Sequence, residues 1–202
     1  MKLYYTPGAC SLAPHIVAEE AGLKYDLVKV DLGTHKTESG VDYYSINPRG
    51  YVPALVLDGG ATVTEVGSLI EYLSDQNPSA GLMPAVGSLD RVQTRSWIVF
   101  IATEIHKTFA PLFSPKTPAE MRETLIARLQ TRFKELDERL ATQDWIMGAH
   151  FSVVDAYAFT ILNWSNFIKL DLSDYSHLVS YMARVAARPA VHAAMKAEGL
   201  VQ

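Results

Sequence analysis

The stretch that decides the fold runs from Leu3 to Pro14 and reads LYYTPGACSLAP. Its first three residues are apolar and typical of a β-strand, and Pro7-Gly8 predicts a turn shortly after them. A helical pattern of apolar residues follows. Pro14 fits its first turn, because the first N–H groups of a helix have no partner within it. Cys10 is therefore expected where a strand gives way to the N-terminus of a helix.

Cys10 is the only cysteine among the 202 residues. A lone cysteine is more often a small buried hydrophobic residue than a reactive group. Here, however, the aligned peptide dipoles of a helix N-terminus favour a thiolate. The run from Cys10 to Ala13 also matches a Cys-x-x-Cys redox motif in which alanine replaces the second cysteine. We therefore predict a functional Cys10 with a depressed pKa, whose thiol partner comes from outside the chain.

The composition is that of an ordinary folded protein, with 49% hydrophobic and 20% charged residues. The net charge of −4 provides no attraction to nucleic acid or to an anionic membrane. No apolar run reaches membrane-spanning length, and no apolar leader follows Met1. One cysteine suits a reducing compartment. We therefore expect a cytoplasmic protein with no nucleic-acid or membrane partner.

The first part of the chain predicts a small sheet with helices. Residues 25–31 form a second strand, and the strand–helix–strand spacing favours a parallel βαβ unit. Residues 54–57 and 61–64 flank the turn Asp58-Gly59-Gly60 and predict a hairpin. A helix from about Glu65 ends at Asn77-Pro78, and a short helix is expected near residues 41–45.

The second part predicts helices only. Residues 77–89 are rich in Pro, Gly and Ser and indicate a linker. Ser152 and Asp155 predict a capping box with a structural role, which starts an apolar helix in the middle of a bundle. One helix is expected over about 90–110, and the next follows a first capping box at 117–120 that places Pro118 at the first helical position. Further helices are expected over about 156–168, over 175–187 and over 190–198.

This order of elements, with a cysteine at the first junction, is that of the thioredoxin fold, and a helical second domain resembles a glutathione S-transferase. The motifs that narrow the resemblance to the bacterial beta class are Lys2–Tyr5, Gly8–Leu12, Asn47–Leu55, Thr64-Glu65, Ile101–Lys107 and Phe151–Tyr157. They cover the whole chain in order. The expected fold is therefore an α/β thioredoxin-like domain over 1–78, a linker over 79–89 and an all-α domain over 90–202.

The resemblance implies an enzyme that conjugates glutathione to small hydrophobic electrophiles. It implies glutathione as co-substrate, no cofactor, no metal and a homodimer. It assigns catalysis to Cys10 and His106, with His106 orienting or protonating at the sulfur near Cys10. The fallback hydroxyl donors are Ser11, Tyr4 and Tyr5.

The resemblance also implies how glutathione binds. Pro53 cannot donate to a strand ladder, and the resemblance makes it cis, so that Val52 pairs with the cysteinyl unit of the tripeptide. Glu65 and Val66 then take the γ-glutamyl ammonium and carboxylate, although an acidic residue there could serve only its own helix dipole. The other residues assigned to glutathione are Cys10, His35, Thr103, Glu104 and His106.

An acceptor pocket is implied at four apolar residues of the helical domain, although aromatic residues at such positions more often belong to the core. They are Phe109, Leu112, Phe113 and Trp164. The chain departs from the family at four positions, where Lys, Gln, a small residue and Asn are common. These positions hold His35, Tyr51, Val66 and Val99. Because His35 and Val99 replace a lysine and an asparagine, two polar contacts are lost and weaker glutathione binding is predicted.

Two other functions fit the same residues. One is glutathione-dependent thiol–disulfide exchange through a mixed disulfide at Cys10. The other is a binding protein that keeps the fold without catalysis. Retention of Cys10, Pro53, Glu65 and His106 together argues against the binding protein, since a scaffold needs none of them.

Overall fold

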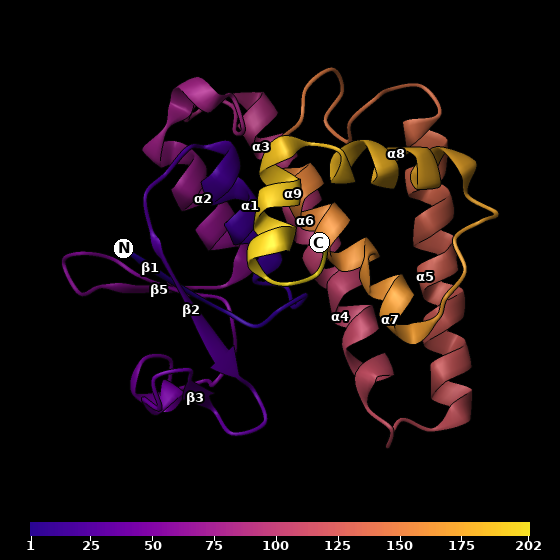
Figure 1. The fold of residues 1–202 in the computed structure, drawn as a ribbon. Helices are drawn as coiled ribbons and strands as arrows, with labels where there is room; N and C mark the ends of the chain where they lie inside the picture. Colours follow the sequence, from indigo (N-terminus) through magenta and orange to yellow (C-terminus); the bar gives the residue numbers. More distant parts are fainter. The chain divides into compact units, whose positions relative to one another are not determined.

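The computed structural model describes residues 1–202, whose contacts divide the chain into two compact units. The first unit joins Met1–Met83 with Ala187–Gln202, and the second unit comprises Pro84–Ala186. The first unit contains a sheet with helices, whereas the second has helices and no strand (Figure 1). The expected combination of an α/β part and an all-α part is confirmed.

The sheet of the first unit has five strands in the order β3-β2-β1-β4-β5. The strands are β1 (Lys2–Tyr5), β2 (Asp26–Asp31), β3 (Lys36–Thr37), β4 (Ala54–Val56) and β5 (Thr62–Thr64). β1 pairs in parallel with β2 and antiparallel with β4, and β4 pairs antiparallel with β5. The predicted βαβ unit and hairpin are therefore both present. A short 3₁₀ helix, η1 (Tyr43–Ser45), lies in the connection expected to hold a short helix.

Three helices complete the first unit. They are α1 (Leu12–Glu20), α2 (Val66–Gln76) and α9 (Pro189–Ala197), and α1 packs against both of the others (Figure 1). Most of α1 is buried, including His15. A further 3₁₀ turn, η2 (Pro78–Ala80), follows α2.

The C-terminal segment is tied to the rest of the first unit by buried and partly buried polar contacts. The Glu198 carboxylate lies 2.8 Å from His15 Nδ1 and accepts a hydrogen bond of 2.9 Å from the Gly8 N–H. Arg188 donates two hydrogen bonds, of 2.6 and 2.8 Å, to Glu20 on α1. The compact units thus differ from the expected single domain over 90–202. Helical periodicity reveals that a segment is helical but not which surface its apolar face covers.

The second unit begins with a helix that changes its winding. α3 (Leu89–Phe100) continues into η3 (Ile101–His106), a π-helical turn, and then into α4 (Lys107–Phe109) and the 3₁₀ turn η4 (Ala110–Phe113). The sequence predicted one regular helix over 90–110. π-Turns are rare inside helices and concentrate at functional sites.

α5 (Ala119–Leu140) starts without the expected capping box. Its N-cap is Pro118, which has extended backbone angles and is not the first helical residue. The Thr117 hydroxyl donates instead to the Pro111 carbonyl at 2.6 Å. The prediction was wrong because the preceding turn engages the hydroxyl that the cap would have needed.

The capping box at Ser152 and Asp155 is present and begins α6 (Val153–Leu162), every residue of which is buried. The Asp155 carboxylate accepts hydrogen bonds from the N–H groups of Ser152 and Ile146, each of 2.9 Å, and from the Tyr181 hydroxyl. Burial raises the pKa of Asp155. One carboxylate therefore joins three segments of the helical core.

The remaining helices are α7 (Trp164–Ile168) and α8 (Ser176–Ala186), and α8 packs on α5 and α6. The sequence predicted one helix through to Ile168, but α6 ends at Leu162. None of the helices combines the length and apolarity needed to cross a membrane.

Candidate functional site

Cys10 lies two residues before the start of α1, as predicted, and is half-buried. Its thiol Sγ–H donates a hydrogen bond of 3.3 Å to the Val52 carbonyl. The peptide bond between Val52 and Pro53 is cis, as the resemblance implied. The structure thus brings together three residues that the sequence singled out: Cys10, Val52 and Pro53.

The pKa of Cys10 is opposite to the prediction. Burial raises the pKa of the thiol to about 12, and the Glu65 carboxylate raises it further. The N–H groups of Cys10 and Ser11 lower it, but by less. The expected effect of the helix terminus is therefore present but outweighed. Withdrawing a thiolate from water destabilises it by more than the two backbone N–H groups stabilise it. Cys10 is a neutral thiol at pH 7.

Only one of the two backbone polar groups of Val52 makes a hydrogen bond within the chain. Its carbonyl accepts from Cys10, while its N–H makes no hydrogen bond within the chain. The preceding Tyr51 carbonyl is fixed by donors from Tyr43 at 2.9 Å and Asn47 at 2.6 Å. Val52 precedes β4 and thus presents a backbone edge that is held in place and has a free N–H, which is suited to pairing with an extended peptide.

The N-terminus of α2 lies open. Its N-cap, Glu65, has a φ of +72°, which a residue with a side chain rarely adopts, and its side chain forms no cap. The carboxylate pairs with Arg49 at 3.2 Å, and both side chains are largely exposed. Glu65 therefore does not cap α2 through its side chain, and the alternative that its charge serves only the helix dipole stays open. The backbone strain at Glu65 was invisible to sequence reasoning.

His35 sits beside an aromatic ring in the same unit. It has a φ of +52°, and its imidazole lies 4.5 Å from the Tyr44 ring. The His35 Nδ1 is buried and has no hydrogen-bond partner. A side chain at Gly50 would come within 2.7 Å of the Tyr44 ring, so Gly50 allows this loop to close.

In the second unit, His106 ends the π-turn and is half-buried. Its Nδ1 lies 2.7 Å from the Tyr157 hydroxyl, and its ring contacts Trp164 edge-to-face at 4.9 Å. Burial, helped by Lys107, lowers the pKa of His106 to about 4. His106 is therefore a neutral imidazole at pH 7.

The residues expected to form an acceptor pocket gather around Trp164. Its ring contacts Phe109 at 6.0 Å and Phe113 at 5.2 Å, both edge-to-face. Phe109 and Leu112 are buried, whereas Phe113 is 46% exposed. Phe109 also packs on Phe133, so it has the surroundings of a core residue, and Phe113 offers most of the accessible apolar surface.

Thr103 and Glu104 are occupied by contacts within the second unit. The Thr103 hydroxyl donates to the Val99 carbonyl at 2.9 Å. Arg128 and Arg132 of α5 hold the Glu104 carboxylate at 2.8 and 3.0 Å, and hydrogen bonding from Arg128 lowers the pKa of Glu104. Glu104 thereby connects the π-turn to α5.

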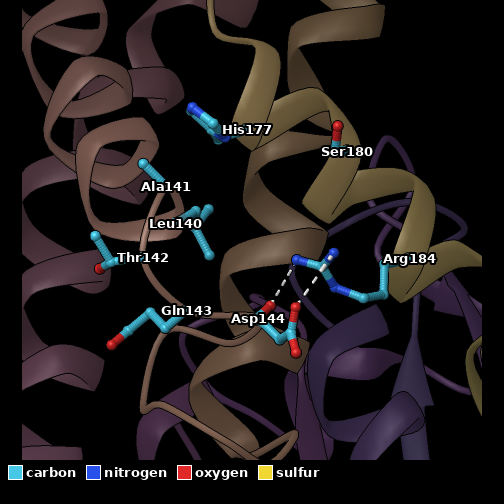
Figure 2. A pocket seen from close by; sticks show the side chains of 8 residues that line it. All are labelled: Leu140, Ala141, Thr142, Gln143, Asp144, His177, Ser180 and Arg184. Carbon is cyan, nitrogen blue, oxygen red and sulfur yellow. Dashed lines mark hydrogen bonds and ion pairs between the residues drawn. The ribbon is translucent and has the colours of Figure 1, made fainter.

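A polar hollow of about 290 Å³ lies elsewhere in this unit, between the end of α5 and α8 (Figure 2). Arg184 crosses it and donates a hydrogen bond of 2.7 Å to the Asp144 carbonyl. Its lining includes none of the residues that the sequence singled out. No group of His, Cys, Asp or Glu side chains in the chain has an arrangement that could hold a metal ion.

Comparison with known proteins gives two family matches. The glutathione S-transferase N-terminal domain matches residues 8–76, and the glutathione S-transferase C-terminal domain matches residues 100–189. The chain is 46% identical over 200 residues to the glutathione S-transferase GstA of Escherichia coli O157:H7, covering 99% of this chain and 100% of that one.

Solved structures agree. A sphingomonad glutathione S-transferase complexed with glutathione superposes with a TM-score of 0.96 at 46% identity, over 100% of both chains. The bacterial beta class glutathione S-transferase of Sphingomonas chungbukensis gives 0.96 at 45%, again over 100% of both. With both halves matched and relatives alike over the whole length, this chain belongs to the bacterial beta class of the glutathione S-transferase family.

Proposed function

We propose that the chain is a glutathione transferase that joins the sulfur of glutathione to small hydrophobic electrophiles. The observation that carries this is the Val52 edge, which has a free N–H, a cis proline after it and the Cys10 thiol on its carbonyl. Extended peptides bind such edges through main-chain hydrogen bonds. In the reaction the glutathione S–H gives its proton to water, the sulfur forms a bond to the electrophilic carbon, and the leaving group departs with the electron pair of the bond that breaks.

The binding roles follow from the two features of the first unit. Val52 and Pro53 present the edge that pairs with the cysteinyl unit. The open N-terminus of α2, at Val66, takes a carboxylate, and Glu65 takes the γ-glutamyl ammonium. His35 contributes at the position where the family commonly has lysine. Thr103, Glu104 and His106 of the second unit complete the proposed set.

The two catalytic roles follow from the protonation states. Cys10, with its raised pKa, turns its one S–H from the Val52 carbonyl to the glutathione sulfur, where it acts as a hydrogen-bond donor and not as a nucleophile. His106, neutral and half-buried, acts as a second polar group at that sulfur. The acceptor contacts the exposed ring of Phe113, and the buried Trp164, Leu112 and Phe109 form the apolar layer beneath it.

This assignment favours conjugation over thiol–disulfide exchange. Exchange requires the Cys10 thiolate, and a pKa of about 12 leaves almost none of it at pH 7. The test is to measure the wild-type protein with glutathione plus a haloaromatic acceptor, and separately with a glutathione mixed disulfide. Turnover of the acceptor that is lowered but not abolished in Cys10→Ala supports the proposal. Turnover of the disulfide alone, abolished in Cys10→Ala, contradicts it.

Retention on immobilised glutathione without turnover of either substrate would instead identify a binding protein. A Val52→Pro variant removes the free N–H of the proposed edge and should lose this retention. A Val179→Ala variant, on an exposed side chain of α8, serves as the matched control and should bind normally.

Glutathione affinity should respond to His35. A lysine at this position restores a cation that the family commonly has, and one added charge-assisted contact strengthens binding by about tenfold. Calorimetric titration of His35→Lys against the wild-type protein measures this. Equal affinities would place position 35 outside the binding site.

We also propose that the chain forms a homodimer through α3. Leu89, Val92 and Val99 lie on one face of this helix, and each is more than half exposed. Val86, just before α3, adds another exposed apolar side chain. Such apolar surface marks protein interfaces. Light scattering should report a dimer for the wild-type protein and a monomer for Val92→Glu, and a wild-type monomer would contradict this.

A cytoplasmic location, with a role in detoxifying electrophiles, completes the proposal. The free thiol of Cys10 suits a reducing compartment. Fractionation of cells that express the protein tests the location, and recovery in the periplasm would contradict it.

A further inference from the structure

Tyr157 is hydrogen-bonded to His106 but has no role in the proposed reaction. It lies on α6, is 2% exposed, and its hydroxyl oxygen is 2.7 Å from His106 Nδ1. The two rings also meet edge-to-face, with centroids 5.9 Å apart and an angle of 89° between planes. A distance of 2.7 Å is that of a strong hydrogen bond.

The chemistry of the two groups fixes the direction of this hydrogen bond. A neutral imidazole has one protonated nitrogen and one that only accepts, and the bond made by one nitrogen decides the state of the other. A phenol O–H is more acidic than an imidazole N–H, and an imidazole nitrogen is a better acceptor than a phenol oxygen. The favoured arrangement therefore has Tyr157 donating to Nδ1, with the imidazole proton on Nε2.

The other ring nitrogen is left available. His106 is half-buried and makes no hydrogen bond in the chain besides the one to Tyr157, so Nε2 has no protein partner. The edge-to-face contact with Trp164, at 4.9 Å and 78°, packs against the imidazole from a second helix. Rotating the ring would break the Tyr157 bond, so the orientation of Nε2 is held from two sides.

We propose that Tyr157 is a positioning residue that holds His106 as the Nε2–H tautomer, so that His106 donates a hydrogen bond and cannot act as a base. The ligand atom that suits this donor is an electron-rich one, such as the thiolate sulfur of glutathione. In this respect the inference rests on the proposed function, in which His106 acts at that sulfur. The low pKa of His106 agrees with it, since an uncharged ring has a defined tautomer.

The test uses the full chain with ¹⁵N-labelled histidine at pH 7. Long-range ¹H–¹⁵N NMR distinguishes protonated from unprotonated ring nitrogens, and the six histidines are sorted by the loss of one set of signals in His106→Gln. We expect a protonated Nε2 and an unprotonated Nδ1 for His106 in the wild-type protein. A protonated Nδ1 overturns the proposal, whatever any variant does.

Two tyrosine variants sharpen the result. Tyr157→Phe removes the donor to Nδ1, so the His106 signals should move toward the average of two tautomers. Tyr181→Phe is the matched control, because it removes another buried hydroxyl of the same unit, one bonded to Asp155. Its His106 signals should match the wild type. Unchanged His106 signals in Tyr157→Phe also overturn the proposal.

Kinetics of the same proteins separate this inference from the proposed function. Loss of the fixed tautomer should lower the kcat of conjugation roughly twofold to tenfold in Tyr157→Phe, with an unchanged KM for glutathione. A raised KM with unchanged kcat contradicts a role at the sulfur. A wild-type protein with the expected tautomer but no conjugation would contradict the proposed function and still support the assignment of the proton to Nε2.

Discussion

Cys10 in the first unit and His106 in the second are both withdrawn from water, and burial shifts their pKa values in opposite directions. Burial raises the pKa of the cysteine to about 12 and lowers the pKa of the histidine to about 4, so both groups are uncharged across the neutral range. Each is also hydrogen-bonded to a neutral partner, Val52 for Cys10 and Tyr157 for His106. Both groups thus offer hydrogen bonds, and neither offers a charge.

The comparison corrects a common inference from sequence. A cysteine before a helix suggests a thiolate, and a histidine in a transferase motif suggests an acid or base. Both suggestions consider the local chain and omit the solvent that folding removes. At Cys10 desolvation outweighs the backbone N–H groups, and at His106 it lowers the pKa in the same direction as the Lys107 charge.

The largest effect should be seen in the alkylation of Cys10. A raised pKa means that the rate with iodoacetamide keeps rising through pH 10 without a plateau, whereas an ordinary thiol has its midpoint near about 8.5. At pH 7 the folded chain should react roughly a hundredfold more slowly than the same chain in guanidinium, after allowing for the higher nucleophilicity of a more basic thiolate. A midpoint at or below about 8.5 would show that burial does not raise the pKa of Cys10.

The second effect concerns stability in acid. The unfolded chain protonates His106 below a pH of about 6.5, while the folded chain does so only near 4, so protons favour unfolding between these values. The free energy of unfolding should fall by up to about 3 kcal/mol over this range relative to His106→Gln. Urea denaturation at several pH values measures the difference. Parallel pH profiles for the two proteins would show that His106 titrates normally.

A third, smaller effect tests the neighbouring charge at Cys10. Glu65 raises the pKa of the thiol in addition to burial, so Glu65→Gln should lower it. Because the Glu65 side chain is largely exposed, the gain in alkylation rate should stay below about tenfold and shrink in high salt. Glu138→Gln, which removes an equally exposed charge from α5, should alkylate like the wild type. Acceleration in both variants would point to net charge and not to Glu65.

The smallest expected effect concerns the charge next to His106. Lys107 helps to lower the pKa of His106, so Lys107→Gln should raise that pKa without bringing it to the ordinary value near about 6.5. NMR titration of the His106 ring reports the change, with Lys134→Gln on α5 as the control. A full return to the ordinary value would make charge, and not burial, the main cause.

Sequence reasoning performed best where the physical cause is local. The βαβ unit, the hairpin and the Ser152 cap follow from alternation, turn residues and capping chemistry, all of which act over a few neighbouring positions. The resemblance added the cis proline at Pro53, which no local pattern specifies.

Sequence reasoning failed where the physical cause lies in distant parts of the chain. Thr117 donates to Pro111 and not to its own helix, and Glu104 is held by Arg128 and Arg132 of another helix. The π-turn at 101–106 and the positive φ of Glu65 leave no mark in the residue types. The protonation states of Cys10 and His106 depend on burial, which only the folded chain defines.

The attachment of α9 to α1 also has a consequence for the order in which the chain acquires its structure during synthesis. The first unit is discontinuous, since residues 187–202 belong with residues 1–83. A ribosome delivers the N-terminal strand and helix first and the residues that cover them last. The Gly8 N–H, two residues before Cys10, therefore gains its Glu198 partner only after the whole helical unit has been made. The turn that carries the cysteine is among the first parts of the chain to be synthesised and among the last to be completed.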